Sequence, residues 1–575
     1  MMRILLACSS LLLFAACTQK KEKSLKELRL SLSSELSTID PAGCYDTVCA
    51  PVVANSYETL YEYEYLKRPY QLRPLLAEEM PIFEEGGKKI TIKLKKNIPY
   101  HPQSFLAPDR VVEAQDIVMA IKRQAFVPTQ GKGWWLFENR IQGLDDWRTK
   151  VKDDFEALFT TAVSGLETPD KHTLVIRLTK PFPQLLFSLA MTFTSPVPAE
   201  AVRHFKNDLN MAMVGTGPFV LVDYNPNQQA IFERFPGYVS SSYPSQGDRF
   251  ANEQGLLTDA GKKLPFVDRV SMVVMKEQQT SWLNFLGGKI DVLSLTKDYY
   301  EAALDRDGKL NAELKGKNVK LQVAPTLIYW WLAFNMKDPV VGKNLTLRQA
   351  ISHGIDVEKF IKLFTNNTGQ KANSIYPPGV PGYNPSAELP YRYDLAKAKE
   401  LLAKAGYPNG KGLPEITFDV RGNSTLQRQM AEFVVQELRA MGIPAKPNLN
   451  SFPVFLERSR RGELQFWHGG WVVDYPDAEN ILQLLTSNNF PPGPNASFYS
   501  NAKVDNIFNR VSVMEEGPEK HKLMEELEAE LHRDLPWVML YYTRSYTLTQ
   551  SKVKNFRYSD IIFNNTKYFN LTDEK

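Results

Sequence analysis

The sequence predicts an α/β fold in which helices cover a sheet. The clearest unit begins at Asp394, which can cap a helix whose apolar residues recur at helical spacing until Gly406 and Pro408 end it. A strand is predicted at 416–420, and a second amphipathic helix then runs to Gly442. Such alternation of helix and strand is typical of helices packed on the faces of a sheet.

Shorter segments add strands to this unit. Alternating apolar and polar residues predict half-buried strands at 28–32, 90–94 and 174–178. Two more strands, 220–222 and 230–233, are separated by turn-forming residues and predict a hairpin. With 43% hydrophobic and 23% charged residues over 575 positions, the chain has the composition of a globular protein with several domains.

The N-terminus predicts export and lipid attachment. Residues 1–3 carry a positive charge, and residues 4–16 form an almost wholly apolar run. Such a helix spans roughly 20 Å, shorter than a hydrocarbon core of about 30 Å, so it fits a secretory signal better than a transmembrane helix. The run ends in LFAAC, which resembles a bacterial lipobox with Cys17 as the lipidated residue. We interpret 1–16 as a signal peptide and 17–26 as a polar tether, with cleavage without lipid as the alternative.

The balance of charge argues against one class of partner. The formal net charge is +4, and the basic residues are interspersed with acidic ones. Proteins that bind nucleic acid normally carry a concentrated basic surface, which this pattern lacks. We therefore expect no nucleic-acid partner.

The cysteines leave one pair to explain. Cys8 would be removed with the signal peptide, and Cys17 would carry lipid. Cys44 and Cys49 remain, and in an oxidising compartment they form either a small-loop disulfide or two buried thiols. No CxxC pair is present, so the cysteines suggest no metal or redox site.

The motifs of common enzymes are absent from the sequence. The seven histidines show no metal-ligand spacing, and neither a GxSxG elbow nor a phosphate loop occurs. Gly215 and Gly217 begin like a dinucleotide fingerprint, but Pro218 follows at once and predicts a tight turn. Asp474 with Asp477 is weak support for a glycosidase, because such chemistry needs two carboxyl groups at a defined separation. We expect no catalysis, no cofactor and no metal.

Several segments, in a fixed order along the chain, resemble one protein family. They are 76–79, 91–101, 114–123, 215–219, 334–335, 347–356, 393–407 and 540–542. The stretch YDLAKAKELLAKAGY at 393–407 is nearly the family's own signature. On these segments the chain resembles extracellular solute-binding protein family 5, the oligopeptide- and dipeptide-binding proteins of peptide/nickel ABC transporters. The resemblance extends over about residues 27–570.

The resemblance implies a two-lobed periplasmic-binding-protein clamp, type II-like, that closes on its ligand by hinge motion. A small additional domain would pack on lobe I. The expected division is lobe I at 27–60, 186–265 and 543–575, the additional domain at 61–185, and lobe II at 266–542.

The implied function is binding, not catalysis. Such a protein captures peptides outside the cytoplasm and delivers them to the permease subunits of an ABC importer. We expect a monomer that a lipid anchors to the outer face of a bacterial membrane, on the periplasmic side or at the cell surface.

The segment 466–480 (FWHGGWVVDYPDAEN) resembles the stretch in which this family binds its ligand. There an aspartate that follows a tryptophan pairs with the ligand's α-ammonium, and here that position is Asp474, three residues after Trp471. A buried ammonium requires an ionised partner, because an unpaired charge out of water costs several kcal/mol. From the residues alone, the Asp-Tyr-Pro-Asp run also fits a simple turn.

The same resemblance assigns two further roles. Gly470 to Val472 would bind the peptide through backbone N–H and C=O groups, which accept many side chains. His468 stands where some family members carry an arginine for the ligand's carboxylate, a role that an imidazole performs only weakly near neutral pH.

Two alternatives stay open at this point. The same fold binding a nickel chelate, haem, sugar or opine would lack the amine-pairing carboxylate or engage it elsewhere. A secreted hydrolase would place two carboxylates in the cleft and turn its ligand over.

Overall fold

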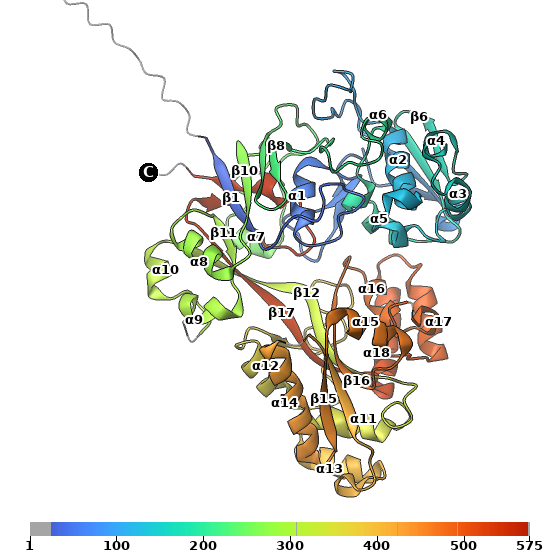
Figure 1. Ribbon diagram of the computed structural model, residues 1–575, viewed down its shortest axis with the longest axis vertical. Coiled ribbons are helices and arrows are strands. Elements are labelled where there is room, and N and C mark those ends of the chain that lie inside the picture. The colour runs from blue at the N-terminus through green and yellow to red at the C-terminus, as the bar shows by residue number, and fades with distance from the viewer. Residues whose placement is uncertain (1–24, 306, 423, 492, 573–575) are drawn as a thin grey trace, which may run out of the picture.

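The computed structural model describes residues 25–572 except 306, 423 and 492. The expected signal peptide, the expected lipidation site Cys17 and nearly all of the expected tether lie outside the described residues. Figure 1 shows two large parts, one above the other, joined by long strands. Within the described part of the chain, no helix combines the length and apolarity needed to cross a membrane.

Lobe I is built on a four-stranded sheet in the order β1-β10-β9-β8. Its strands are β1 (Glu27–Leu32), β8 (Phe219–Asn225), β9 (Gln229–Arg234) and β10 (Arg269–Val274), and helices α1 (Cys49–Ser56) and α7 (Arg249–Glu253) belong to the same part. Two small pairs, β2 (Tyr61–Tyr63) with β3 (Leu72–Pro74) and β18 (Val553–Lys554) with β19 (Asn570–Leu571), complete it. The expected hairpin is confirmed, since β8 and β9 pair antiparallel.

One boundary differs from the expected division. Strand β10 begins at Arg269, beyond the expected start of lobe II at residue 266, yet it pairs parallel with β1 and antiparallel with β9. The hydrogen bonds of this sheet therefore hold β10 in lobe I. The expectation placed it elsewhere because its partner β1 is about 240 residues away in the sequence.

The additional domain has its own sheet, in the order β4-β5-β7-β6, and its own core. Its strands are β4 (Ile82–Glu84), β5 (Lys89–Lys93), β6 (Leu166–Asp170) and β7 (Thr173–Arg177). Its helices are α2 (Ala114–Ala125), α3 (Leu144–Val151), α4 (Phe155–Thr160), α5 (Leu185–Ser188) and α6 (Ala199–His204). The core continues to Val214, past the expected end of this domain at 185.

A mixed sheet in the order β11-β17-β12-β16-β14-β15, with β13 paired to β17, extends from the upper part of the molecule, where β11 lies, into lobe II (Figure 1). Its strands are β11 (Val292–Ser294), β12 (Lys320–Phe334), β13 (Gln370–Lys371), β14 (Ile416–Arg421), β15 (Ala445–Asn450), β16 (Phe466–Val472) and β17 (Trp537–Thr549). Helices α11 (Leu345–Gly354), α12 (Val357–Phe364), α13 (Leu395–Lys404) and α14 (Thr425–Met441) contribute to one core. Helices α15 (Phe452–Arg461), α16 (Glu479–Leu482), α17 (Ala502–Val511) and α18 (Pro518–Asp534) contribute to a second. Helices α8 (Gln278–Leu286), α9 (Tyr300–Ala303) and α10 (Ala312–Gly316) form a smaller cluster beside β11.

The helix–strand–helix unit predicted from Asp394 onward is confirmed. The Asp394 side chain accepts a hydrogen bond from the backbone of Lys397 and caps α13. Gly442 ends α14 in the left-handed conformation, with φ of 98°, which glycine adopts without steric penalty.

Two long strands join the lobes. Strands β12 and β17 pair antiparallel along most of their length, with a register shift between Pro325 and Tyr329. In Figure 1 they run from the upper part into the lower one. Strand β16, which carries the predicted binding segment, pairs directly with the lower half of β12. The segment is therefore attached to the strand that connects the lobes.

Candidate functional site

A cavity of about 320 Å³ lies between the lobes. Its lining residues lie within the segments 44–63, 190–193, 472–474 and 560–564. Side chains such as Phe193 make much of the wall apolar. The charged side chains among its described lining residues are all carboxylates, those of Asp46, Glu62, Asp474 and Asp560.

Asp474 lies two residues beyond the end of β16 and faces this cavity. Its Oδ1 accepts a hydrogen bond from the Tyr45 hydroxyl at 3.0 Å, and its Oδ2 accepts one from Asn480 Nδ2 at 3.1 Å. Burial raises the pKa of Asp474, although these two hydrogen bonds oppose the shift. Both donors are neutral, so the ionised carboxylate has no cation to balance it among these partners.

Asn480 connects Asp474 to Trp471, and the sequence did not indicate its role. Asn480 Oδ1 accepts hydrogen bonds from Trp471 Nε1 at 2.9 Å and from the Asp474 backbone N–H at 3.1 Å. One amide side chain therefore fixes both the carboxylate and the tryptophan. The expectation paired Trp471 with Asp474 by spacing, and the structure joins them through this third residue.

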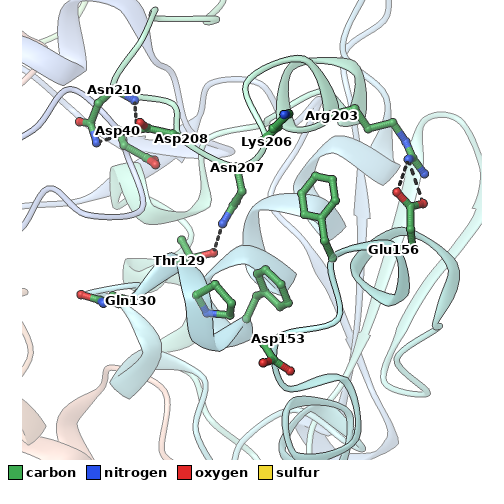
Figure 2. Close-up of a pocket in the computed structure, with 13 residues that line it drawn as sticks. Asp40, Thr129, Gln130, Asp153, Glu156, Arg203, Lys206, Asn207, Asp208 and Asn210 are labelled. Carbon is green, nitrogen blue, oxygen red and sulfur yellow. Dashed lines mark hydrogen bonds and ion pairs between the residues drawn. The ribbon is translucent and has the colours of Figure 1, made fainter.

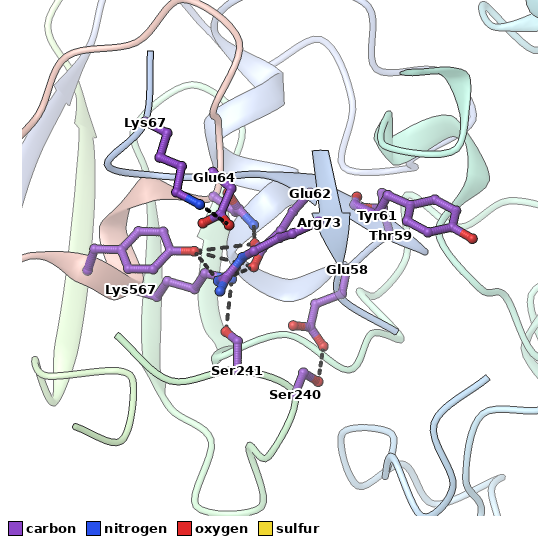
Figure 3. A network of polar contacts seen from close by, with 12 residues as sticks. Glu58, Thr59, Tyr61, Glu62, Glu64, Lys67, Arg73, Ser240, Ser241 and Lys567 are labelled. Atoms are coloured by element: carbon purple, nitrogen blue, oxygen red, sulfur yellow. Dashed lines mark hydrogen bonds and ion pairs between the residues drawn. The ribbon is translucent and has the colours of Figure 1, made fainter. Parts of the chain in front are cut away.

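The other carboxylates of the cavity differ in how well they are compensated. Burial alone would raise the pKa of Glu62, but the charges of Lys567 and Arg73 outweigh it and lower the pKa to about 2. Figure 3 shows this network, in which Glu62 accepts from Lys567 Nζ at 2.8 Å and Arg73 Nη2 at 2.6 Å. Asp560 instead accepts from the Leu327 backbone and the Tyr558 hydroxyl, and burial raises its pKa. Negative charge thus remains uncompensated on the cavity wall.

Part of strand β16 offers an open edge. Its neighbour β14 pairs with it only at Phe466 and Trp467, whereas β12 pairs with it over its whole length. From residue 469 to Val472, the edge that faces β14 therefore has no partner among the described strands. Gly470 and Val472, predicted to bind through their backbone, lie on this stretch.

Arg421 is a second candidate residue that sequence reasoning missed, although it is not among the described residues that line the cavity. It is the last residue of β14, and its guanidinium carbon lies 4.6 Å from the centre of the Trp330 ring. Burial lowers the pKa of Arg421, and its guanidinium makes no hydrogen bond or ion pair with any residue that the structure describes. Strands β14 and β16 are parallel, so Arg421 and Asp474 lie toward the same edge of the sheet. The sequence held no motif that marked this arginine.

His468 does not lie where the resemblance placed it. Its ring stacks on Trp330 at 5.0 Å and lies 6.1 Å from Phe360, on the face of the sheet that α12 covers. Burial, helped by the charge of Arg421, lowers the pKa of His468 to about 3, so the imidazole is neutral. It is absent from the cavity lining. The structure therefore places this ring in the core under α12 and not in the cavity, which Val472 lines from a position further along the same face of the strand.

The segment that carries Asp474 also makes direct contacts across the cleft. The Phe187 ring stacks on Tyr475 with centroids 5.4 Å apart, and Gln184 Nε2 donates to Asp477 Oδ1 at 3.4 Å. Both contacts join α5 or the residue before it to the loop after β16. Contacts between the two lobes thus form part of the site.

The disulfide partners lie on the opposite wall. Cys44 and Cys49 are joined by a disulfide, and the residues 44–47 line the cavity. The loop that this bond closes carries Tyr45, the hydrogen-bond donor to Asp474.

A second hollow, of about 750 Å³, shares no lining residue with the interlobe cavity. Figure 2 shows its side chains, among which Arg203 pairs with Glu156 at 3.0 Å. Its Asp40 is engaged by Arg123 at 2.6 Å. These charges are satisfied within the protein, so the interlobe cavity is the stronger candidate.

Comparisons with known proteins agree with this architecture. The family model described as bacterial extracellular solute-binding proteins, family 5 Middle, matches residues 71–491. Heme-binding protein A of Haemophilus influenzae is 25% identical, over 86% of this chain and 83% of its own. The glutathione-binding protein GsiB of Salmonella typhi is 23% identical, over 90% of this chain and 88% of its own.

Two solved structures share the fold. The periplasmic binding protein DppA of Helicobacter pylori, in complex with the peptide STSA, aligns with a TM-score of 0.68 at 24% identity over 95% of this chain and 98% of its own. HbpA2 of Haemophilus parasuis aligns with a TM-score of 0.76 at 21% identity over 95% of this chain and 100% of its own. The family match covers well over half of the sequence. The chain belongs to the bacterial extracellular solute-binding proteins of family 5.

Proposed function

We propose that this protein is the substrate-binding lipoprotein of an ABC importer, which binds short peptides between its lobes and delivers them to the permease. The observation that carries the proposal is Asp474, a carboxylate on the cavity wall whose hydrogen-bond donors are both neutral. Lipid anchoring at Cys17 and a monomeric state belong to the same proposal. So does the division into two lobes and an additional domain, with β10 moved to lobe I.

Asp474 has no cationic partner among its hydrogen-bond donors, and an ammonium group would supply one. Removing a carboxylate from water is unfavourable unless a cation or several donors replace the lost hydration. The described lining of the cavity contains acidic side chains and no lysine or arginine, which favours a cationic group over an anionic one. The free N-terminus of a peptide supplies such a group without restricting its side chains.

The open edge of β16 would orient a bound peptide along the strand. An extended peptide there would add a strand and use backbone hydrogen bonds. Arg421 lies level with residue 469 by continuation of the parallel register, and from there to Asp474 is about 16 Å along a strand. A peptide of about four residues has this length, and the arginine would pair with its carboxylate.

The names of the relatives give two other ligands, heme and glutathione. Glutathione is itself a small peptide with a free ammonium, so it fits the same chemistry. Heme presents carboxylates and no ammonium, and an acidic cavity wall opposes it. No feature of the site favours a non-peptide solute over a peptide.

The direct test is identification of the bound ligand. The purified protein is mixed with a synthetic pool of tri- to pentapeptides, and native mass spectrometry records which masses remain bound. We expect peptides with both termini free to be retained and to be recovered unaltered after incubation. Failure to retain any peptide would refute the proposal, and recovery of cleaved fragments would support a hydrolase instead.

Arg421→Gln is expected to reduce the preference for a free carboxyl terminus. The variant keeps a polar side chain but removes the charge that would pair with the ligand's carboxylate. We expect affinity for a retained peptide to fall about tenfold, while affinity for its C-terminally amidated form stays the same. Calorimetric titration with the two peptides measures this ratio. Arg428→Gln, on the first turns of α14, is the control, and an equal loss for both peptides would contradict the role.

A further inference from the structure

We propose that Tyr45 is the lobe I half of the ammonium site and that the Cys44–Cys49 disulfide holds it in place. This inference rests on the proposed function, because it assumes that a ligand ammonium pairs with Asp474. It adds a contact from the opposite lobe, and it makes affinity depend on an oxidised loop.

The position of Tyr45 is not explained by packing. Its side chain remains 54% exposed, although its ring contacts Phe193 at 5.8 Å and Trp135 at 6.3 Å. Its hydroxyl nevertheless donates to Asp474, which is 429 residues away in the sequence and belongs to the other lobe. Partial burial and the charge of Asp474 both raise the pKa of Tyr45, so the phenol stays protonated and remains a donor.

The phenol has capacity left for a ligand. A tyrosine hydroxyl donates one hydrogen bond and accepts through two lone pairs. With its proton on Asp474, its oxygen can still accept an N–H from an ammonium that sits beside the same carboxylate. The ligand's ammonium would then touch Asp474 of lobe II and Tyr45 of lobe I together. Because the ammonium would contact both lobes at once, its binding would stabilise the closed arrangement of the lobes.

The disulfide restricts the loop that presents this hydroxyl. Cys44 and Cys49 close a short loop that leads directly into α1. Inside it, Asp46 Oδ1 accepts from the backbone N–H groups of Val48 at 2.9 Å and Cys49 at 2.8 Å. A side chain held in its bound position loses less conformational entropy when the ligand arrives. Loss of the disulfide would remove the one covalent restraint on this loop and leave it held by hydrogen bonds and ring contacts alone.

The test uses the tightest peptide found in the pool and its N-acetylated form, which lacks the charge and most of the N–H donors. Calorimetric titration gives the preference of each variant for the free amine. We expect Tyr45→Phe to reduce this preference about tenfold, and Cys44→Ser with Cys49→Ser to reduce it similarly. Adding Tyr45→Phe to the cysteine variant should cause no further loss. Reduction of the wild-type protein with dithiothreitol should reproduce the cysteine variant.

Tyr499→Phe is a matched control, because the Tyr499 hydroxyl donates to Asp534 at 2.7 Å outside the cavity. It should leave the preference unchanged. A Tyr45→Phe variant that weakens both peptides equally, or neither, would overturn the inference and leave the proposed function intact. A cysteine variant with the full preference would overturn the part assigned to the disulfide. If Asp474→Ala keeps the full preference, or if no peptide binds, the proposed function fails and takes this inference with it.

Discussion

Asp474→Ala is expected to weaken peptide binding by about 2–5 kcal/mol, which corresponds to a loss of affinity between about thirtyfold and several thousandfold. The cause is that the ammonium group of the peptide would be removed from water and would find no ionised partner in the cavity. Tyr45 and Asn480 would remain, but both are neutral. Calorimetric titration with a retained peptide measures the change.

The structure offers a close control for this substitution. Asp534 also accepts hydrogen bonds from one tyrosine and one asparagine, Tyr499 at 2.7 Å and Asn501 at 2.8 Å, but it lies outside the cavity. Asp534→Ala should leave affinity unchanged. Asp474→Asn should bind as weakly as Asp474→Ala, because it keeps the shape of the side chain and loses the charge. Unchanged affinity in both Asp474 variants would refute the assignment.

The same assignment fixes the pH dependence of binding. Burial raises the pKa of Asp474 above the ordinary 3.8, so its carboxylate takes up a proton earlier on acidification than an exposed aspartate does. Only the ionised form pairs with an ammonium. Affinity should therefore fall on acidification, and the fall should begin at a higher pH than it would for an exposed aspartate.

Lys567→Met is expected to lower the free energy of unfolding by about 3 kcal/mol, the scale for breaking a buried ion pair. Lys567 and Glu62 are 0% and 3% exposed, so the unpaired carboxylate would gain no water. Arg73 would remain as an ion-pair partner of Glu62 and keeps the loss near the lower end of that range. Urea denaturation followed by circular dichroism measures it.

Two companion variants separate the buried pair from general surface effects. Lys404→Met removes an exposed pair with Glu400 and should change stability by less than about 1 kcal/mol. Glu62→Gln combined with Lys567→Met and Arg73→Met removes all three charges of the network and should recover part of the loss. A Lys567→Met protein as stable as the wild type would contradict the role of the network.

The network also predicts the direction of acid sensitivity. The pKa of Glu62 is lowered from 4.5 to about 2 in the folded protein, so its stabilising contribution is complete above about pH 4.5 and is lost as the pH falls toward 2. In Lys567→Met the pKa of Glu62 rises. The variant should therefore unfold at a higher pH than the wild type during acid titration.

Local patterns were enough to predict parts of the fold and not others. The unit around α13, β14 and α14 was predictable because its caps and apolar spacing lie within one stretch of chain. The pairing of β1 with β10 was not, because no local pattern says which distant strands meet. The lobe boundary was therefore placed too early.

The sequence likewise predicted only some residues of the candidate site. The motif around Asp474 identified the carboxylate, but Asn480, Tyr45 and Arg421 acquire their roles only when the fold brings them near it. For His468, the resemblance identified the position in the sequence but could not predict where along β16 its ring would lie relative to the cavity. In the structure this ring lies in the core under α12.

The bond between Lys567 and Glu62 joins residues 505 positions apart, near the two ends of the described chain. A domain assembled from both ends of its sequence cannot finish folding until the final residues have been delivered. Contacts of such sequence separation also form slowly. Lobe I therefore stays incomplete until residues 553–571, which supply β18, β19 and Lys567, have joined strands formed near the other end of the described chain.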